Sequence, residues 1–321
     1  MRYFVTGGAG FIGSNFVEHL FGNVDDLTGV TIYDKFTYAA NPKNYQNLLG
    51  EPRLKIIEGD ICNYNFLKDS MLEHDFVVHF AAESHVDRSI KDPSDFIRTN
   101  VMGTYNVLES SLRNKVKTVI NVSTDEVYGS LPYGSADETY PLKPNSPYAA
   151  SKSAADLLAR SFFITYGLDV RTTRCCNNYG KSQFPEKVIP VFIRKLLNQE
   201  KLPIYGDGEN VREWIHVSDH SSGIQKVLEA GQAGEIYNIG SGIHLTNNQL
   251  ASEILNAMNL DEGMKNYVED RLGHDFRYSV NSSKIENLGF KQKINFTHGL
   301  KETIDWYLVN QNWWESQEEF H

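Results

Sequence analysis

The stretch Met1–Ser14 reads MRYFVTGGAGFIGS, and it decides the fold. Arg2–Thr6 is an apolar run of strand length, and the glycines after it satisfy G-x-G-x-x-G through Gly8, Gly10 and Gly13. Glycines at a strand-to-helix turn let the backbone approach a pyrophosphate, which lies on the free N–H groups of the helix N-terminus. The stretch therefore predicts a dinucleotide site.

The second expected strand, Val30–Asp34, ends in an acidic residue 21 positions after Gly13. A carboxylate there accepts hydrogen bonds from the adenosine ribose and repels a 2′-phosphate, so NAD is favoured over NADP. The alternative is a structural glycine turn followed by an unrelated surface Asp, and the strand–turn–helix context disfavours it. Ligands of open α/β sheets gather where strands end. The residues at the next two strand ends are Asp60, Ile61, Ala81 and Ala82. We expect them to contact the cofactor together with Gly7, Gly10 and Gly13 of the glycine turn.

Apolar runs alternate with amphipathic ones through the first half of the chain, which predicts a Rossmann-like, doubly wound parallel sheet of the α/β class. The expected strands are Arg2–Thr6, Val30–Asp34, Leu54–Glu58, Phe76–Phe80, Lys117–Ser123 and Asp169–Arg174, and the expected helices include Ile12–Phe21, Tyr64–Leu72 and Val101–Asn114. After about residue 175 the alternation of strand and helix patterns becomes irregular. We expect an NAD-binding domain at 1–175 and a smaller mixed α/β substrate lobe at 176–321, with some chain returning to the first domain.

Composition excludes several classes of protein. The formal net charge of −10 argues against nucleic acid or an anionic membrane as the main partner. The N-terminus lacks the features of a signal peptide, and no apolar run reaches membrane-spanning length. Cys62, Cys175 and Cys176 fit reduced, buried thiols of a cytoplasmic protein. We predict no metal site.

Two clusters carry acid–base chemistry. Tyr148 and Lys152 form a Tyr-x-x-x-Lys on one face of a helix that Ser146 caps. The Lys ammonium, together with a nicotinamide cation, is expected to lower the pKa of the phenol. Ser123–Glu126 reads STDE at the end of the fifth strand, where paired carboxylates disfavour joint ionisation and give an acid beside a base. A surface Tyr–Lys pair and a solvated Asp-Glu turn are the alternatives; the NAD motif disfavours both.

These motifs resemble the dTDP-glucose 4,6-dehydratase family of extended short-chain dehydrogenases. The matching segments are Thr6–Ser14 (TGGAGFIGS), Ala81–Ile90 (AAESHVDRSI), Ser123–Gly129 (STDEVYG), Tyr148–Lys152, Asn177–Gly180 (NNYG), Gln183–Pro190 (QFPEKVIP) and Asp270–Asp275 (DRLGHD). The resemblance implies that Tyr148, supported by Lys152 and Thr124, takes the 4-hydroxyl proton while C4 hydride passes to NAD. Glu126 then removes the C5 proton, Asp125 protonates the departing 6-hydroxyl, and hydride returns to C6.

The resemblance also implies binding residues. Further NAD contacts are expected at Phe11, Ile12, Lys35, Thr37, Thr99, Asn178, Tyr148 and Lys152. Substrate contacts are expected at Ser84, Thr124, Asn177, Glu186, Lys187, Val188, Pro203, Ile204, Tyr205, Arg212, Asn247, Arg271 and His274. Ala40, Cys176 and Glu213 depart from the family pattern without removing a catalytic group.

The resemblance implies a homodimer built on helices near 99–114 and 147–166, with Val107, Leu112, Leu157 and Leu158 as apolar candidates for the contact. Other interpretations remain open: a UDP- or CDP-glucose 4,6-dehydratase, a nucleotide-sugar 4-epimerase, or a non-catalytic NAD-binding protein. The Asp125–Glu126 pair argues against an epimerase, which needs no carboxylates at C5 and C6. The complete acid–base set argues against a non-catalytic protein.

Overall fold

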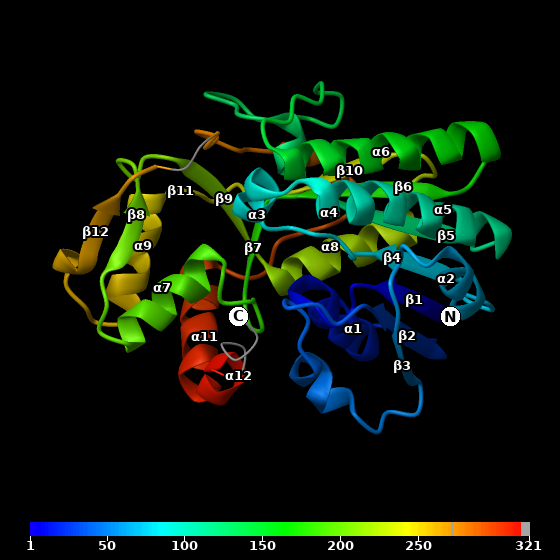
Figure 1. Ribbon diagram of the computed structural model, residues 1–321, viewed down its shortest axis with the longest axis horizontal. Coiled ribbons are helices and arrows are strands. Elements are labelled where there is room, and N and C mark those ends of the chain that lie inside the picture. Colours follow the sequence, from blue (N-terminus) through cyan, green and yellow to red (C-terminus); the bar gives the residue numbers. More distant parts are fainter. Residues whose placement is uncertain (271–272, 316–321) are drawn as a thin grey trace.

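A computed structural model of the protein describes residues 1–270 and 273–315. Its main unit is a seven-stranded sheet in the order β10-β6-β5-β4-β1-β2-β3, in which every pairing is parallel (Figure 1). The strands are β1 (Arg2–Thr6), β2 (Gly29–Asp34), β3 (Leu54–Glu58), β4 (Phe76–His79), β5 (Thr118–Thr124), β6 (Val170–Cys175) and β10 (Ile236–Ile239). The predicted Rossmann-like sheet is thus confirmed.

Helices cover both faces of this sheet, and its strands alternate accordingly. Val5 packs into a core with Phe16 of α1 and Val227 of α8, whereas the neighbouring Phe4 packs into a second core with Leu108 of α5. This period of two is what a strand buried on both faces requires. The helices of this unit are α1 (Phe11–Asn23), α2 (Tyr64–Ser70), α3 (Val86–Lys91), α4 (Ser94–Phe96), α5 (Thr104–Arg113), α6 (Pro147–Tyr166), α8 (Val217–Ala230) and α10 (Ser283–Glu286).

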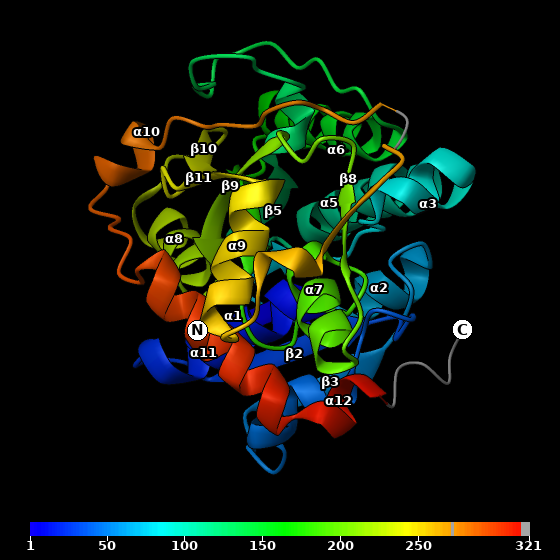
Figure 2. The same cartoon turned by 90° about the vertical axis from the view of Figure 1, so that its left-hand side faces the viewer.

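A smaller lobe lies beside the carboxyl edge of the sheet, as Figures 1 and 2 show. Its two small sheets follow the orders β11-β9-β7 and β12-β8. The strands are β7 (Asn177–Tyr179), β8 (Leu202–Tyr205), β9 (Val211–His216), β11 (His244–Thr246) and β12 (Lys265–Val268), and the helices are α7 (Val188–Leu197), α9 (Asn247–Ala257), α11 (Phe296–Val309) and α12 (Gln311–Glu315). Trp313 and Trp314 are buried in its core.

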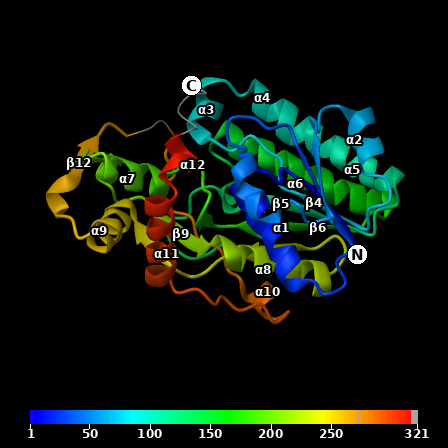
Figure 3. The same cartoon turned by 90° about the horizontal axis from the view of Figure 1, so that it is seen from below.

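The chain crosses between the two units more than once. Although β10 falls within the stretch 176–321, it pairs with β6 and forms an edge of the main sheet. α8 also returns, because Ile224 and Leu228 pack with α1 in the main core (Figure 3). Irregular spacing could not reveal this, since a strand and helix of the main sheet have the same pattern wherever they fall in the chain.

One helix differs from its sequence pattern. The expected helix at Val101–Asn114 begins earlier, as the π-helical segment η2 (Ile97–Gly103), before α5 continues it. A Cβ on Gly103 would lie 2.4 Å from Cδ1 of Ile61, so this glycine permits the close packing. Asn100 in η2 donates hydrogen bonds to the carbonyl oxygen of Glu83 and to Oγ of Ser151, tying the segment to α6. Among the described residues, no helix is long and apolar enough to cross a membrane.

Candidate active site

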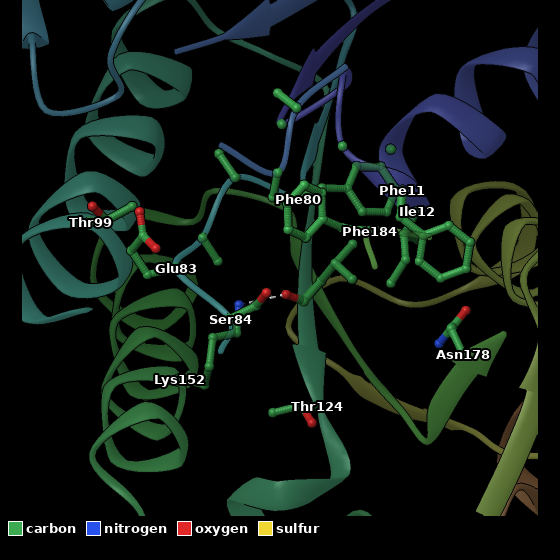
Figure 4. Close-up of a pocket in the computed structure, with 18 of the residues that line it drawn as sticks. Phe11, Ile12, Phe80, Glu83, Ser84, Thr99, Thr124, Lys152, Asn178 and Phe184 are labelled. Atoms are coloured by element: carbon green, nitrogen blue, oxygen red, sulfur yellow. Dashed lines mark hydrogen bonds between the residues drawn. The ribbon is translucent and has the colours of Figure 1, made fainter. Parts of the chain in front are cut away.

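A cavity of about 350 Å³ opens where the strands of the main sheet end and the smaller lobe begins (Figure 4). Every residue predicted to contact the cofactor lines it, as do the five predicted catalytic residues. Of the predicted substrate contacts, Ser84, Asn177, Glu186, Lys187 and Val188 line it too. The structure therefore brings the cofactor motif and the acid–base residues into one space.

The glycine turn fits a dinucleotide because side chains cannot be accommodated there. Gly7 has a φ of +69°, and a Cβ on it would lie 2.5 Å from the backbone nitrogen of Ala81. A Cβ on Gly13 would lie 2.2 Å from the carbonyl oxygen of Gly7. At the start of α1, within the described part of the chain, Gly10 offers no side-chain cap and the first turn holds no acidic residue. The N–H groups of this turn are thus open to a diphosphate.

Asp34 organises the same turn from the end of β2. Its carboxylate accepts hydrogen bonds from the backbone N–H groups of Ala9 and Phe36, each at 2.9 Å. Burial raises the pKa of this carboxyl, and these backbone donors oppose the rise. The side chain is 8% exposed and lines the cavity, so its remaining lone pairs fit the expected contact with a ribose.

Tyr148 and Lys152 enter the cavity from the first turns of α6, where Oγ of Ser146 caps the helix by accepting from the N–H of Ala149. Nζ of Lys152 donates to the carbonyl oxygen of Val122 at 2.8 Å. Burial raises the pKa of Tyr148 well above its ordinary value, with the charges of Glu126 and Asp125 adding to the rise and a hydrogen bond with Thr124 opposing it. The lowered pKa expected for Tyr148 therefore does not arise from the chain alone.

Asp125 and Glu126 follow β5 in the short 3-10 turn η3 (Asp125–Tyr128), which Thr124 caps. Burial raises the pKa of Asp125 well above its usual range, and the charges of Glu126 and Glu213 add to this effect. Oγ1 of Thr124 donates to Oδ1 of Asp125 at 3.2 Å, whereas the buried Oδ2 has no hydrogen-bond partner among the described residues. Burial and these charges thus favour the protonated form of Asp125, and one of its oxygens is unsatisfied within the described chain.

Glu213, which the sequence marked only as a departure from the family pattern, raises the pKa of Asp125 through its charge. It lies on β9, is completely buried, and accepts hydrogen bonds from the backbone N–H groups of Ser241, Gly242 and Val280 at 2.7, 2.8 and 3.1 Å. Burial opposes ionisation of Glu213, but His244 and these donors outweigh it and hold its pKa below the ordinary value. Only the folded chain brings these donors to one carboxylate, so the sequence carried no signal for it.

Glu186 lies between the two units at the cavity wall. Its Oε1 accepts from the hydroxyl of Tyr38 at 3.3 Å, and its Oε2 lies 3.8 Å from Nε2 of His85 and 3.9 Å from Nε of Arg88. Nζ of Lys187 donates to the carbonyl oxygen of Ser84 at 3.0 Å. Polar groups from both units thus meet where the sugar is expected.

The other predicted substrate contacts are not among the residues that line the cavity. Arg212 is buried, with Nη2 donating to the carbonyl oxygen of Asp275 at 2.9 Å and its guanidinium 4.5 Å from the ring of Tyr278. Tyr205 is 42% exposed, and its ring centroid lies 6.4 Å from that of His274. The others are Pro203 on β8, Ile204, whose side chain is buried in the lobe core, and Asn247 at the start of α9. Arg271 lies outside the described residues.

Sequence reasoning also missed several apolar walls of the cavity. Phe80 follows β4, Phe184 follows β7, and Trp214 lies on β9, and all three line the space. Figure 4 shows Phe80, Phe184 and Phe11 gathered across the cavity from Lys152 and Thr124. Cys175 and Cys176 are buried, as expected, and line it too, whereas Cys62 is only partly buried. Burial raises the pKa of the Cys175 thiol to about 12. Among residues 1–270 and 273–315, no cluster of His, Cys, Asp or Glu is arranged to hold a metal ion.

The parallel sheet, the glycine turn and the adjacent Tyr-x-x-x-Lys define an extended short-chain dehydrogenase. A family model described as GDP-mannose 4,6 dehydratase matches residues 4–303. A dTDP-glucose 4,6-dehydratase of Streptomyces griseus is 51% identical over 314 residues, which are 97% of this chain and 95% of the relative. The chain therefore belongs to the dTDP-glucose 4,6-dehydratase family.

Solved structures agree with this assignment. DesIV, a dTDP-glucose 4,6-dehydratase of Streptomyces venezuelae crystallised with NAD, shares 50% of its sequence with this chain and superposes with a TM-score of 0.97, covering 99% of this chain and 100% of DesIV. UDP-glucose 4-epimerase of Thermotoga maritima is 29% identical, with a TM-score of 0.90 and coverage of 97% and 100%. The fold is thus common to dehydratases and epimerases.

The raised pKa of Asp125 predicts a stabilising substitution. The folded protein keeps the proton to higher pH than the unfolded chain does, so the stability cost appears above about pH 4 and grows as the pH rises toward the folded pKa. Asp125→Asn removes that cost, at about 1.4 kcal/mol for each pH unit between the unfolded and folded pKa values. We expect a higher melting temperature at pH 7 and a gain that shrinks toward pH 4, measured by calorimetry.

The control for this measurement is Asp69→Asn, because the carboxylate of Asp69 is 68% exposed. Exposed substitutions of this kind change stability by less than about 0.5 kcal/mol. An Asp125→Asn protein that is less stable than the parent at pH 7, with the control unchanged, would show that Asp125 is ionised in the fold.

Proposed function

We propose that this chain converts dTDP-glucose to dTDP-4-keto-6-deoxyglucose, with NAD as its bound cofactor and a nucleotide sugar as its substrate. The observation that carries the proposal is the pair Asp125 and Glu126, held in one cavity with Tyr148 and Lys152. Oxidation alone requires a base at the hydroxyl that reacts, but elimination of water also requires an acid and a second base. The pair supplies both, because burial and the charge of Glu126 raise the pKa of Asp125 and so favour its protonated form.

The residues act in the order that the sugar requires. When bound, NAD accepts and returns the hydride, and its cationic nicotinamide ring supplies the positive charge that favours the phenolate of Tyr148. Tyr148 takes the 4-hydroxyl proton, with Thr124 hydrogen-bonded to the phenol. The resulting 4-ketone acidifies C5–H, which Glu126 deprotonates. Asp125 then donates its proton to the 6-hydroxyl, which leaves as water. The C5–C6 double bond that results is reduced when the hydride returns to C6 and Glu126 returns its proton to C5.

The binding assignments follow from the same geometry. The glycine turn and Asp34 would hold the diphosphate and ribose of NAD, and Asn178 would be a further NAD contact. Ser84, Asn177 and Glu186 would contact the sugar, and Lys187 and Val188 would line the channel for the nucleotide. The nucleotide contacts at Tyr205, Arg212, Asn247, Arg271 and His274 rest on the family resemblance. The division near residue 175 into an NAD-binding and a sugar-binding part also remains our proposal.

Mass spectrometry of separate incubations with dTDP-glucose, UDP-glucose and CDP-glucose, each with NAD, tests the proposal. We expect dTDP-glucose alone to lose one water, because the chain belongs to a family of this specificity. Loss of water from another nucleotide would keep the mechanism and overturn the base preference. Unchanged mass for all three would contradict a dehydratase, and chromatography for a galactose isomer would then detect an epimerase.

Because Glu126 and Tyr148 act at different steps, a substitution of each should stop the reaction at a different step. Glu126→Gln should still show the absorbance of reduced nicotinamide after dTDP-glucose is added, yet incorporate no deuterium at C5 in deuterated water, and turnover should fall by about 100-fold or more. Tyr148→Phe should fail earlier and show no such absorbance. Normal deuterium incorporation by Glu126→Gln would assign the base to another residue.

We further propose that two copies of the chain pair through η2, α5 and α6. α5 and α6 pack side by side, with the rings of Tyr105 and Phe162 6.1 Å apart. Large apolar side chains remain exposed along these helices: Ile97, Met102, Tyr105, Leu157, Ile164 and Tyr166. Of the four apolar candidates taken from the sequence, only Leu157 is exposed; Val107, Leu112 and Leu158 pack in or against the core.

The proposed pairing predicts that Leu157→Arg combined with Ile164→Arg gives a monomer, because two charges would be buried in an apolar contact. Light scattering after size-exclusion chromatography measures the mass. Val309→Arg is the matched control, since Val309 is 83% exposed on α11. A parent protein of monomer mass would contradict the pairing. A cytoplasmic location is also proposed, on the three free cysteines.

A further inference from the structure

Behind the acid–base residues lies a buried ion pair that the mechanism above does not use. Nε of Arg174 on β6 donates to Oδ2 of Asp156 on α6 at 2.9 Å, and the two side chains are 3% and 2% exposed. Nδ2 of Asn121 on β5 donates to Oδ1 of the same carboxylate at 3.0 Å. A buried ion pair is weak evidence for stability, because desolvation offsets most of its attraction. Its place beside the site suggests a functional role instead.

The pair touches each element that carries a reacting group. Asp156 lies one helical turn after Lys152 on α6, so the two side chains share a face of the helix. Nη1 of Arg174 donates to the hydroxyl of Tyr128 at 2.9 Å, and that hydroxyl donates to Oδ1 of Asn238 at 2.7 Å. Tyr128 closes the turn η3, which begins with Asp125 and Glu126. One ion pair thus joins the helix of the lysine to the turn of the carboxylates.

Lys152 needs a negative charge nearby. Its side chain is almost wholly buried, and the carbonyl oxygen of Val122, which accepts a hydrogen bond from its Nζ, is a neutral group. Burial lowers the pKa of Lys152, and the charge of Asp156 is the largest influence opposing that fall. A buried ammonium without a countercharge releases its proton, since desolvation disfavours the charged form.

The other ionisable groups around Lys152 do not replace Asp156. His79 on β4 is neutral, because burial, with Lys152 adding to it, lowers its pKa to about 3. Cys175 on β6 is a thiol with a raised pKa, and burial also raises the pKa of Asp125 in η3 well above its usual range. Tyr148 on α6 is a phenol of raised pKa, Arg174 carries a positive charge, and Glu126 is the base of the reaction.

We infer that Asp156, fixed by Arg174 and Asn121, is a positioning residue for the reaction: its carboxylate balances the charge of Lys152, and Arg174 with Tyr128 holds the Asp125–Glu126 turn in register with α6. This inference rests on the proposed function, because it assigns Lys152 its role beside Tyr148. It predicts that the charge of Asp156 determines the pH range of turnover, although Asp156 does not contact the sugar.

The experiment compares Asp156→Asn with Asp156→Glu. Asparagine keeps the size and removes the charge, whereas glutamate keeps the charge and adds a methylene to a packed site. With Asp156→Asn we expect the alkaline limb of the kcat–pH profile to move to lower pH by about one unit or more, because one close charge of this kind is worth that much. Above the limb, turnover should fall roughly tenfold for each pH unit by which the limb moves, and lower pH should restore it.

The contrast between the variants separates charge from packing. Asp156→Glu should keep the alkaline limb of the parent protein even where its melting temperature falls. KM for the sugar should stay close to the parent value in both variants. A folded Asp156→Asn protein with the parent limb overturns the inference, and so does an equal displacement of the limb in both variants.

A double variant covers the case in which Asp156→Asn does not fold. Asp156→Asn with Arg174→Met removes both buried charges together, which proteins tolerate far better than the loss of one partner. Its limb should also lie at lower pH, because Lys152 still lacks its countercharge; a limb at the parent position overturns the inference. Failure of the proposed function is distinct: the parent protein would then not dehydrate dTDP-glucose at any pH.

Discussion

The parallel pairing of β5 with β6 sets the positions of the reacting groups. In its register Ser123 lies opposite Arg174 and Thr124 opposite Cys175. All seven residues of β5 are buried, and a shift by one residue would exchange the side chains that face the two cores on either side of the sheet. The turn with Asp125 and Glu126 therefore leaves the sheet at a fixed point, beside the segment that begins β7.

Several charged side chains lie close together in and beside this poorly hydrated cavity. Glu213 receives three backbone N–H donors and stays ionised, so its charge, with that of Glu126, disfavours a second carboxylate charge on Asp125. Two like charges about 4 Å apart cost on the order of 4 kcal/mol at the effective dielectric constant of such sites. Burial and repulsion thus act together to keep Asp125 protonated, while Asp156 balances the opposite charge on Lys152. The protonation of Asp125 and of Lys152 thus depends on their surroundings and not on residue type alone.

The sequence predicted the parts of this arrangement that depend on local pattern. The family resemblance supplied most of the binding residues around the cavity, whereas six strands of the main sheet, the glycine turn and the cap at Ser146 follow from periodicity and spacing. The place of β10, the burial of Val107 and the raised pKa of Tyr148 did not, because each depends on which distant segments pack together. Glu213 illustrates the limit: its donors come from Ser241, Gly242 and Val280, and no spacing indicates that they meet.

The fold alone does not choose the reaction. The Thermotoga maritima 4-epimerase shares the architecture at a TM-score of 0.90, so the sheet and the glycine turn are compatible with either chemistry. Oxidation at C4 uses the base on α6, and an epimerase needs little more. Elimination needs a proton removed at C5 and another delivered to the 6-hydroxyl, on neighbouring carbons. Two adjacent residues at the end of one strand meet that demand only if their charge states differ. Burial of Asp125, with Glu126 more exposed beside it, provides that difference.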